Sequence, residues 1–404
     1  MIYRNHLCKS HRSLRWRLGR LPIGLTVGLG IALAAVLATP HPTAAQETSA
    51  SRSLEQARPS RQLLAELFDA VVKTTVEQFV DERRLRAVEW EKLAAERRPA
   101  VVDAGSFAQA AVLINDLLGA LQISHTAVFT PDQIEYYILL DVFASQPRLK
   151  DLIAARFGGS PIAYEGIGAF TTEIAGRHFI DGVFAGSRAA VAGLQFGDEI
   201  VEADGEPFQA IASFRGKADR DVRLAVRRDK DGPVENVALK VERLRPLQSF
   251  RQAHTAGVTV HTVKGKRIGY VPVWASAGKE LQDAFAETIQ KAFNPPVDGL
   301  IVDMRGKVGG TIDTVRGYLQ ALAPRGPLVG FRGRRGHTSA PATYKGRSAL
   351  LIDHHTRSAA EIFAHAFQRE FIGPLVGTRT ARAVSASRLF AMPGGLLLHL
   401  AAYD

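Results

Sequence analysis

Two short loops in the last third of the chain combine residue types suited to nucleophilic chemistry. The first is the run Asp303-Met-Arg-Gly-Lys-Val-Gly-Gly310, which follows an apolar segment and opens a helical pattern. Its paired glycines leave backbone N–H groups free at a helix N-terminus, where a developing oxyanion is best stabilised. The second is Asp353-His-His-Thr-Arg-Ser-Ala-Ala-Glu361, which again runs from strand to helix and exposes Ser358. Alone, Ser358 is simply a helix N-cap; together, the loops place a hydroxyl and an anion hole at the same edge of one sheet.

The segment that must position these loops alternates between strand and helix patterns. An amphipathic helix is expected over residues 280–293, and a buried strand over residues 299–304. The same patterns predict further helices at 311–322 and 358–368, and strands at 267–273, 349–353, 372–376, 388–392 and 396–402. Such alternation predicts an α/β domain with helices packed on a sheet.

Two other regions precede it. Residues 61–122 show apolar stripes at helical spacing, and this helical region ends at Ser124-His125. From about residue 158 the pattern changes to short alternating segments with frequent glycine. This pattern predicts strands at 179–184, 199–203, 222–227 and 236–242.

The N-terminus has the pattern of an export signal. Residues 1–45 carry six cations and no acid, and the apolar stretch 21–37 leads to the small-residue site Thr43-Ala-Ala45. This order predicts a cleaved signal peptide, followed by a polar linker at residues 46–60. The alternative is an uncleaved membrane anchor, since 17 apolar residues just span a bilayer. Cleavage would remove Cys8, the only cysteine, which suits an oxidising compartment.

Composition excludes several classes of protein. With 404 residues, 46% hydrophobic and 23% charged, the chain is neither disordered nor collagen-like nor a multi-span membrane protein, and two or three domains are expected. Of the net charge of +11, six units lie in the first 45 residues, and no basic stretch is interleaved with aromatics, so we expect no nucleic-acid partner. A single cysteine and scattered histidines predict no metal site, and we expect no cofactor.

The segment from residue 158 resembles a PDZ domain. Gly166-Ile-Gly-Ala-Phe170 (Gly166, Ile167, Gly168, Ala169 and Phe170) resembles that family's carboxylate-binding loop, and Gly186–Leu194, Gly197–Ile200 and Asp204-Gly205 match the helix and turn of its bacterial members. Free N–H groups in such a loop hold a peptide C-terminal carboxylate, and an open strand edge pairs with the peptide. The alternative is a β-domain without a ligand.

Residues 60–404 resemble the carboxyl-terminal processing (tail-specific) protease family and its relative, the tricorn protease core. Residues 299–310 are similar to the family run Gly-Leu-Ile-Leu-Asp-Leu-Arg-x-Asn-x-Gly-Gly, and Ser358-Ala-Ala-Glu361 is similar to Ser-Ala-Ser-Glu. The resemblance implies that Ser358 is the nucleophile, and that Ala359 and either Gly309 or Gly310 donate the oxyanion-hole N–H groups. It also implies a crotonase-like (ClpP/crotonase) α/β core with an N-terminal helical region and an inserted PDZ β-domain.

The sequence departs from the family pattern at the base. Most bacterial members have Gly-Glu-x-Thr-Phe-Gly-Lys, whereas this chain has Gly377-Thr-Arg-Thr-Ala-Arg-Ala383, with Ser387 at the place of a later glutamine. Alanine at the lysine's place excludes a Ser–Lys dyad, and a serine needs a nearby base. Ser124-His125 resembles the Ser-His pair of tricorn, which implies that His125 takes the proton and Ser124 helps to orient it.

Other assignments remain open at this stage. Lys307 and the adjacent His354 and His355 are alternative bases. Tricorn-type sites also have a late carboxylate that supports the histidine; either Glu361 serves here, or the chain is truncated at Asp404.

We therefore expect a signal peptide at residues 1–45, a linker at 46–60, a helical region at 61–157, a PDZ domain at 158–245 and a peptidase domain at 246–404. The expected function is that of an exported, periplasmic or extracellular serine endopeptidase that captures the C-termini of unfolded or tagged polypeptides and cleaves them with Ser358. Transient contact with a membrane is left open. The alternative is a catalytically inactive peptide-binding protein on the same scaffold.

Overall fold

The computed structural model describes residues 58–306, 308–322, 344 and 346–402. The expected signal peptide, most of the linker, Lys307 and Asp404 lie outside the described residues. By their contacts, the described residues from Arg58 onward form one compact unit. Within the described ranges, no helix is both long and apolar enough to cross a membrane.

The helical region begins with four helices. Two of them start at serine caps: the Ser60 hydroxyl accepts the Leu63 N–H at 3.1 Å, and the Ser106 hydroxyl accepts the Gln109 N–H at 3.1 Å. The helical prediction for this region is confirmed, and the four helices are α2 (Arg61–Gln78), α3 (Glu82–Ala87), α4 (Trp90–Val102) and α5 (Phe107–Gly119).

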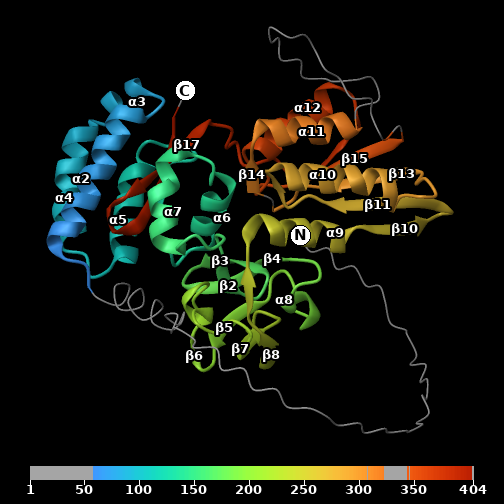
Figure 1. Cartoon of the computed structure of the whole chain (residues 1–404), viewed down its shortest axis with the longest axis horizontal. Coiled ribbons are helices and arrows are strands. Elements are labelled where there is room, and N and C mark those ends of the chain that lie inside the picture. Colours follow the sequence, from blue (N-terminus) through green and yellow to red (C-terminus); the bar gives the residue numbers. More distant parts are fainter. Residues whose placement is uncertain (1–57, 307, 323–343, 345, 403–404) are drawn as a thin grey trace, which may run out of the picture. The chain divides into compact units, whose positions relative to one another are not determined.

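A small antiparallel sheet joins the segment after α5 to the C-terminal hairpin. Its order is β1-β18-β17, with β1 (Ala127–Phe129), β17 (Ser387–Met392) and β18 (Leu396–Ala401). All six residues of the central strand β18 are buried, and its Leu396, Leu398 and Leu400 share a core with α2, α4 and α5. The sequence predicts that the C-terminal hairpin, β17 and β18, belongs to the peptidase domain at residues 246–404. In the structure the hairpin pairs with β1 and packs with the helical region (red strands in Figure 1).

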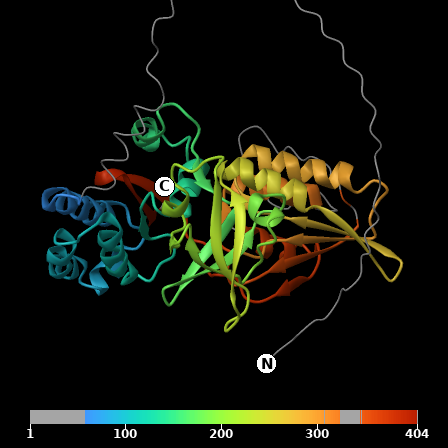
Figure 2. The ribbon, with the colours of Figure 1, turned by 90° about the horizontal axis from the view of Figure 1, so that it is seen from below.

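A helical connection leads from this sheet to a β-domain, defined here as residues 164–244. The connection consists of α6 (Ile134–Val142), a 3-10 turn at Pro147–Leu149 and α7 (Lys150–Phe157). The main sheet of the β-domain has the order β3-β4-β5-β7-β8, with β3 and β8 at its edges, and is drawn in green and yellow in Figure 2. Its elements are β2 (Tyr164–Gly166), β3 (Ala169–Ile174), β4 (Arg177–Val183), α8 (Arg188–Val191), β5 (Glu199–Ala203), β6 (Glu206–Pro207), β7 (Asp221–Arg227), β8 (Val234–Lys240) and β9 (Glu242–Leu244).

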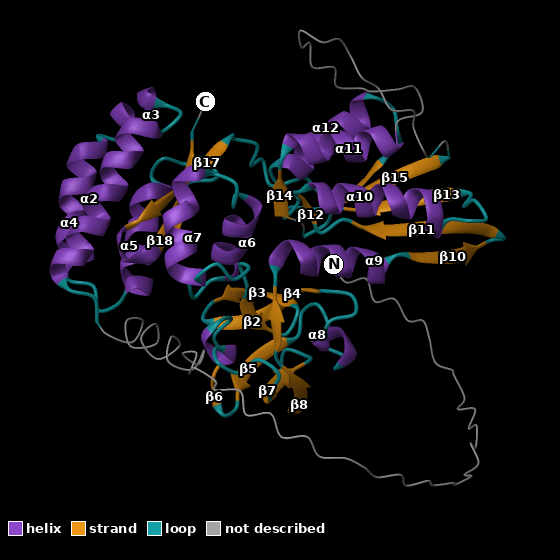
Figure 3. Cartoon of the chain, viewed as in Figure 1, coloured by secondary structure: helices purple, strands orange, loops and turns teal. Residues whose placement is uncertain are grey.

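The last region is an α/β domain, as the strand–helix alternation predicts. Its sheet has the order β10-β11-β13-β15-β16, in which all neighbours are parallel except β10 and β11. Helices α10, α11 and α12 lie along this sheet in Figure 3, and the apolar residues between them form one core. The elements are α9 (Pro246–Gly257), β10 (Thr259–Val263), β11 (Lys266–Pro272), β12 (Ala275–Ser276), α10 (Lys279–Glu287), β13 (Gly299–Asp303), β14 (Val308–Gly310), α11 (Ile312–Leu322), β15 (Arg347–Ile352), α12 (Ala359–Arg369) and β16 (Leu375–Gly377).

Two predicted elements of this domain differ from the structure. The helix expected over 280–293 ends its α-helical part at Glu287 and continues as a π-helical turn at Thr288–Ala292, where the Thr288 hydroxyl bonds the buried His254 ring at 3.1 Å. The strand expected over 372–376 starts only at Leu375. Pro374 has no N–H for the ladder, and it contributes only its carbonyl, which accepts the Leu350 N–H at 3.0 Å.

Candidate active site

Ser358 stands at the point where the loop after β15 enters α12. Its backbone has φ 57° and ψ −127°, a left-handed conformation that costs free energy in a residue with a side chain. The Ser358 N–H donates to the Glu361 carboxylate at 3.0 Å, and the Ser358 carbonyl accepts the Glu361 N–H at 2.9 Å. These bonds hold the serine in an unfavourable conformation, which exposed nucleophiles at strand-to-helix turns commonly adopt.

Side chains tie together the two chemically promising loops, here named the serine loop (residues 353–358) and the glycine loop (residues 303–310). One Asp353 carboxylate oxygen accepts the N–H groups of Gly306, His355 and Thr356, each at 3.0 Å. The Thr356 hydroxyl donates to the Met304 carbonyl at 2.8 Å. The loops therefore form one hydrogen-bonded unit at the carboxyl ends of β13 and β15.

The glycine loop touches the serine directly. A Cβ added to Gly309 would lie 2.4 Å from the Ser358 Cβ, 2.8 Å from its Oγ and 3.2 Å from the Ala359 nitrogen, so only glycine fits. Gly310 has φ 149°, and its Cβ would lie 2.0 Å from the Ser276 carbonyl oxygen in β12. Ala359 is the first residue of α12, so its N–H has no acceptor within that helix. The structure thus brings Ser358, Ala359, Gly309 and Gly310 together.

Glu361 supports this arrangement from the first turn of α12. The side chain is 8% exposed, and its two oxygens accept the N–H groups of Ser358, Arg382 and Ala383, the latter two at 2.8 and 2.7 Å. The backbone of Ala383 therefore lies beside the serine loop, and no lysine is present at this position to deprotonate the hydroxyl. Because three backbone donors occupy the carboxylate, its observed role is to hold the loops.

His125 follows α5 and precedes β1. It has a left-handed φ of 62°, and its Nδ1 lies 3.1 Å from the Ser124 hydroxyl. Burial, with a smaller contribution from the positive charge of Arg357, lowers the pKa of His125 to about 4, and the carboxylate of Glu361 opposes this lowering. Arg357 directly precedes Ser358 and the Glu361 carboxylate accepts the Ser358 N–H, so the imidazole lies within electrostatic range of the serine loop. The hydrogen bonds of the described residues include none between His125 and Ser358.

The other candidate bases are placed differently. The His354 and His355 rings contact each other at a tilt of 44°, with centroids 3.9 Å apart, and His355 Nε2 lies 4.0 Å from the Asp181 carboxylate in β4. Both side chains are exposed and contact each other rather than the serine. Lys307 is outside the described residues.

Sequence reasoning missed a second histidine beside His125. His399, in β18, is 8% exposed; its Nε2 lies 2.7 Å from the Ser387 hydroxyl, and its ring meets the His125 ring edge-on with centroids 5.0 Å apart. Burial, with smaller contributions from His125 and Arg357, lowers the pKa of His399 to about 3. A histidine within the apolar run Leu396–Ala401 was the available signal.

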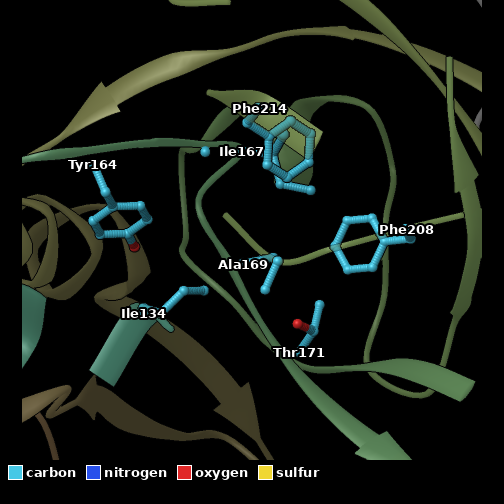
Figure 4. A pocket seen from close by; sticks show the side chains of 9 residues that line it. Ile134, Tyr164, Ile167, Ala169, Thr171, Phe208 and Phe214 are labelled. Atoms are coloured by element: carbon cyan, nitrogen blue, oxygen red, sulfur yellow. The ribbon is translucent and has the colours of Figure 1, made fainter. Parts of the chain in front are cut away.

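The loop expected to bind a carboxylate lies between β2 and β3. Gly168 has φ 78°, and a Cβ there would lie 2.3 Å from the Ser187 Cβ. The Gly168 carbonyl accepts the Ser187 hydroxyl at 3.0 Å and the Phe184 N–H at 2.9 Å. A neighbouring cavity of about 10 Å³ has room for about one water molecule; it is lined mainly by Ile134, Tyr164, Ile167, Ala169, Thr171, Phe208 and Phe214 (Figure 4).

The last residue of that loop connects the β-domain with the α/β domain. The Phe170 ring lies 4.9 Å from the Phe184 ring, 5.9 Å from the Phe250 ring and 6.2 Å from the Trp274 ring, measured between centroids. Trp274 directly precedes β12, which pairs in parallel with β14 of the glycine loop. A continuous set of packed groups therefore runs from Phe170 to Gly310. Among the residues that the structure describes, no group of three or more His, Cys, Asp or Glu is placed to hold a metal ion.

Comparisons with known proteins concern the segment that contains both loops. Residues 267–404 match the model of Peptidase family S41, whose peptidases are serine-type hydrolases, and both loops lie within the matched segment. The chain therefore carries a Peptidase family S41 domain. It is 25% identical over 254 residues to the carboxy-terminal processing protease CtpB of Bacillus subtilis (strain 168), which covers 60% of this chain and 51% of CtpB.

Two further proteins extend the comparison. The tricorn protease of Thermoplasma volcanium is 27% identical over 197 residues, covering 46% of this chain and 18% of that protein. The solved photosystem II D1 C-terminal processing protease has a TM-score of 0.50 and 19% identity, covering 84% of this chain and 87% of that one, which shows a shared fold. This chain spans about half the length of CtpB.

Proposed function

We propose that this protein is an exported serine endopeptidase with Ser358 as its nucleophile. The main observation in support is that Gly309 lies so close to the Ser358 side chain and the Ala359 nitrogen that a Cβ would not fit there. A peptide carbonyl carbon placed against Oγ would have its oxygen directed toward the Ala359 N–H and an N–H of Gly309 or Gly310. Donors fixed in advance stabilise the negative charge as it develops.

His125 is the proposed base. If the Ser124 hydroxyl accepts the Nδ1–H, the Nε2 lone pair is free to take the Ser358 proton. Attack of Oγ forms the C–O bond of a tetrahedral intermediate, and His125 then returns the proton to the leaving amine as the C–N bond breaks. Water, deprotonated by the same imidazole, hydrolyses the acyl-enzyme. A low pKa keeps His125 neutral at neutral pH, as a base requires.

The proposed substrate is an unfolded or tagged polypeptide captured by its C-terminus. We infer that the β-domain is a PDZ domain inserted before a crotonase-like core: β3 is an open edge strand, and the loop 166–170 begins it. A peptide would add to β3, with its carboxylate at the loop amides. Export rests on the pattern of residues 1–45.

A second candidate function is favoured by one observation, the alanine at position 383 beside the serine loop. A protein that kept the peptide-holding scaffold without a competent base would bind peptides and not cleave them. In that case the hydroxyl of Ser358 would not react faster than other serine hydroxyls.

The test uses a fluorophosphonate probe, which labels activated serines. We expect the wild type to label, Ser358→Ala to lose labelling, and Ser348→Ala to label like the wild type. Ser348 is a suitable control because its buried hydroxyl, in β15, has no hydrogen-bond partner among the described residues. A wild type that stays unlabelled while binding peptides with a free C-terminus would favour the second candidate.

A further inference from the structure

We propose that His399, held by Ser387, fixes the orientation of the His125 ring and so acts as a positioning residue for catalysis. This inference rests on the proposed role of His125 as base. His399 does not touch the serine loop in any hydrogen bond of the described residues. Its effect would pass through the ring that it contacts.

Strand register places the three residues side by side. His399 in β18 pairs with Ala127 in β1, two residues after His125, and also with Leu389 in β17. Ser387 is two residues before Leu389, so its side chain lies on the same face of β17, diagonal to His399. The 2.7 Å contact between Ser387 Oγ and His399 Nε2 is the result.

The ring of His399 has little freedom to move. The rings of Phe129 and Phe143 lie 6.5 and 6.4 Å from it, and the plane of the His125 ring stands at 81° to its own. Because the strand is buried, the Ser387 hydroxyl is the hydrogen-bond partner that sets the rotation of the His399 ring. A fixed ring then offers His125 one preferred edge-to-face packing.

His125 needs such support. It sits in a turn with a left-handed backbone, and among the described residues its ring has a single hydrogen bond, to the neighbouring Ser124 hydroxyl. That one bond still permits the ring to tilt away from Ser358. Proton transfer requires close alignment, and a misplacement of about 1 Å can cost about 100-fold in rate.

The contribution of His399 is orientation rather than charge. Burial keeps its imidazole neutral over the pH range in which the serine loop would work, so it adds no charge to the site. The charged groups that act on this pair are Arg357, from the serine loop, and Glu361, from α12, and both act on His125 directly. Ser387 also occupies the place of the glutamine found in members with a catalytic lysine. The chain thus differs from those members at both positions, and the serine now holds a histidine.

The experiment compares Ser387→Ala with Ser387→Thr in the full chain. Ser387→Ala removes the hydroxyl with little change in volume, while Ser387→Thr keeps it. With unfolded casein as substrate, we expect Ser387→Ala to lower kcat and the rate of fluorophosphonate labelling about tenfold at unchanged KM. We expect Ser387→Thr to recover most of the loss. His254→Gln is the control: this histidine is also buried and bonds the Pro272 carbonyl and Thr288 hydroxyl, so its loss should lower stability alone.

Two results would overturn the inference. One is a Ser387→Ala enzyme with wild-type kcat. The other is a fall in kcat that is equally large in Ser387→Thr and that, across the variants including His254→Gln, is proportional to the loss of thermal stability. Nitrogen-15 NMR of the histidines gives a readout that does not need activity. We expect one neutral His125 tautomer in the wild type and a mixture in Ser387→Ala. An unchanged spectrum would reject the positioning role, whether or not the wild type reacts with the probe. A wild type that does not react with the probe would count separately against the proposed function.

Discussion

The serine side and the histidine side of the candidate site are built in opposite ways. On the serine side, residues within one stretch of the chain, 303–361, hold one another through Asp353, Thr356 and Glu361. On the histidine side, residues from positions 124–125 and 387–399 meet through a three-stranded sheet, and the His125 ring has one hydrogen bond within the part of the chain that the structure describes. The first side is therefore fixed by local bonds, and the second depends on pairing between distant segments.

This difference indicates that the serine side is preorganised and that the histidine side is more adaptable. The serine loop keeps an unfavourable backbone because buried charge-assisted hydrogen bonds enforce it. The His125 ring is held mostly by packing. We expect damage on the serine side to remove the reaction centre itself, and damage on the histidine side to be graded with the loss of ring alignment.

The largest expected effect comes from the base. His125→Ala should lower kcat by about 10²–10⁴-fold, because general-base assistance to the serine is lost. The measurement is peptide hydrolysis under single-turnover conditions. His178→Ala is the matched control, since that ring packs on Phe208 within the β-domain. An unchanged rate in His125→Ala would remove the histidine side from the mechanism.

Gly309→Ala should come next, with a loss of about 100-fold in labelling rate. Its new Cβ would collide with the Ser358 side chain and displace the oxyanion donors. Gly119→Ala serves as the control, because a Cβ there meets nothing within 4 Å. If Gly309→Ala labels at the wild-type rate, the glycine loop does not form the anion hole.

Glu361→Ala tests the support of the serine loop. Three backbone donors lose a buried carboxylate, and each hydrogen bond to a charged group is worth about 1.5–3 kcal/mol. We expect the free energy of unfolding in urea to fall by at least about 2 kcal/mol, together with a lower labelling rate. Retained labelling would show that Ser358 keeps its conformation without this carboxylate.

The two buried histidines predict an acid-sensitive fold. The pKa values of His125 and His399 are lowered to about 4 and about 3, so between these values and 6.5 the unfolded chain binds more protons than the folded chain. Stability is then complete above pH 6.5 and falls as pH decreases, by up to about 1.4 kcal/mol per pH unit for each histidine. Urea unfolding at pH 7 and pH 5 measures this slope. His399→Phe should reduce it, whereas an equal slope would contradict the burial of His399.

The smallest expected effect is that of Arg357→Gln. Loss of this cation removes one cause of the low pKa of His125, so the acid limb of the rate profile should move to higher pH. The shift is measured as kcat/KM against pH. An acid limb that stays in place, or moves to lower pH, would show that the charge of Arg357 does not lower the pKa of His125.

The sequence was sufficient to predict most of the serine side of the site, but less of the histidine side. Ser358, the glycine pair and the strands around them were predicted because each signal lies within one short run of residues. The place of the C-terminal hairpin could not be predicted, because pairing of β18 with β1 joins residues about 270 positions apart. His399 was missed for the same reason: its meaning depends on His125 and Ser387, which only the folded sheet brings close. β12 and β14, with two and three residues, are too short for any periodic pattern to show.

The most direct test is the distance between the Ser358 Oγ and the His125 Nε2 in a crystal structure with a peptide boronate bound at the serine. We predict about 3 Å, with the boronate oxygen on the Ala359 N–H. A His125 ring turned away from the serine, with another side chain or only water reaching Oγ, would contradict the proposed mechanism.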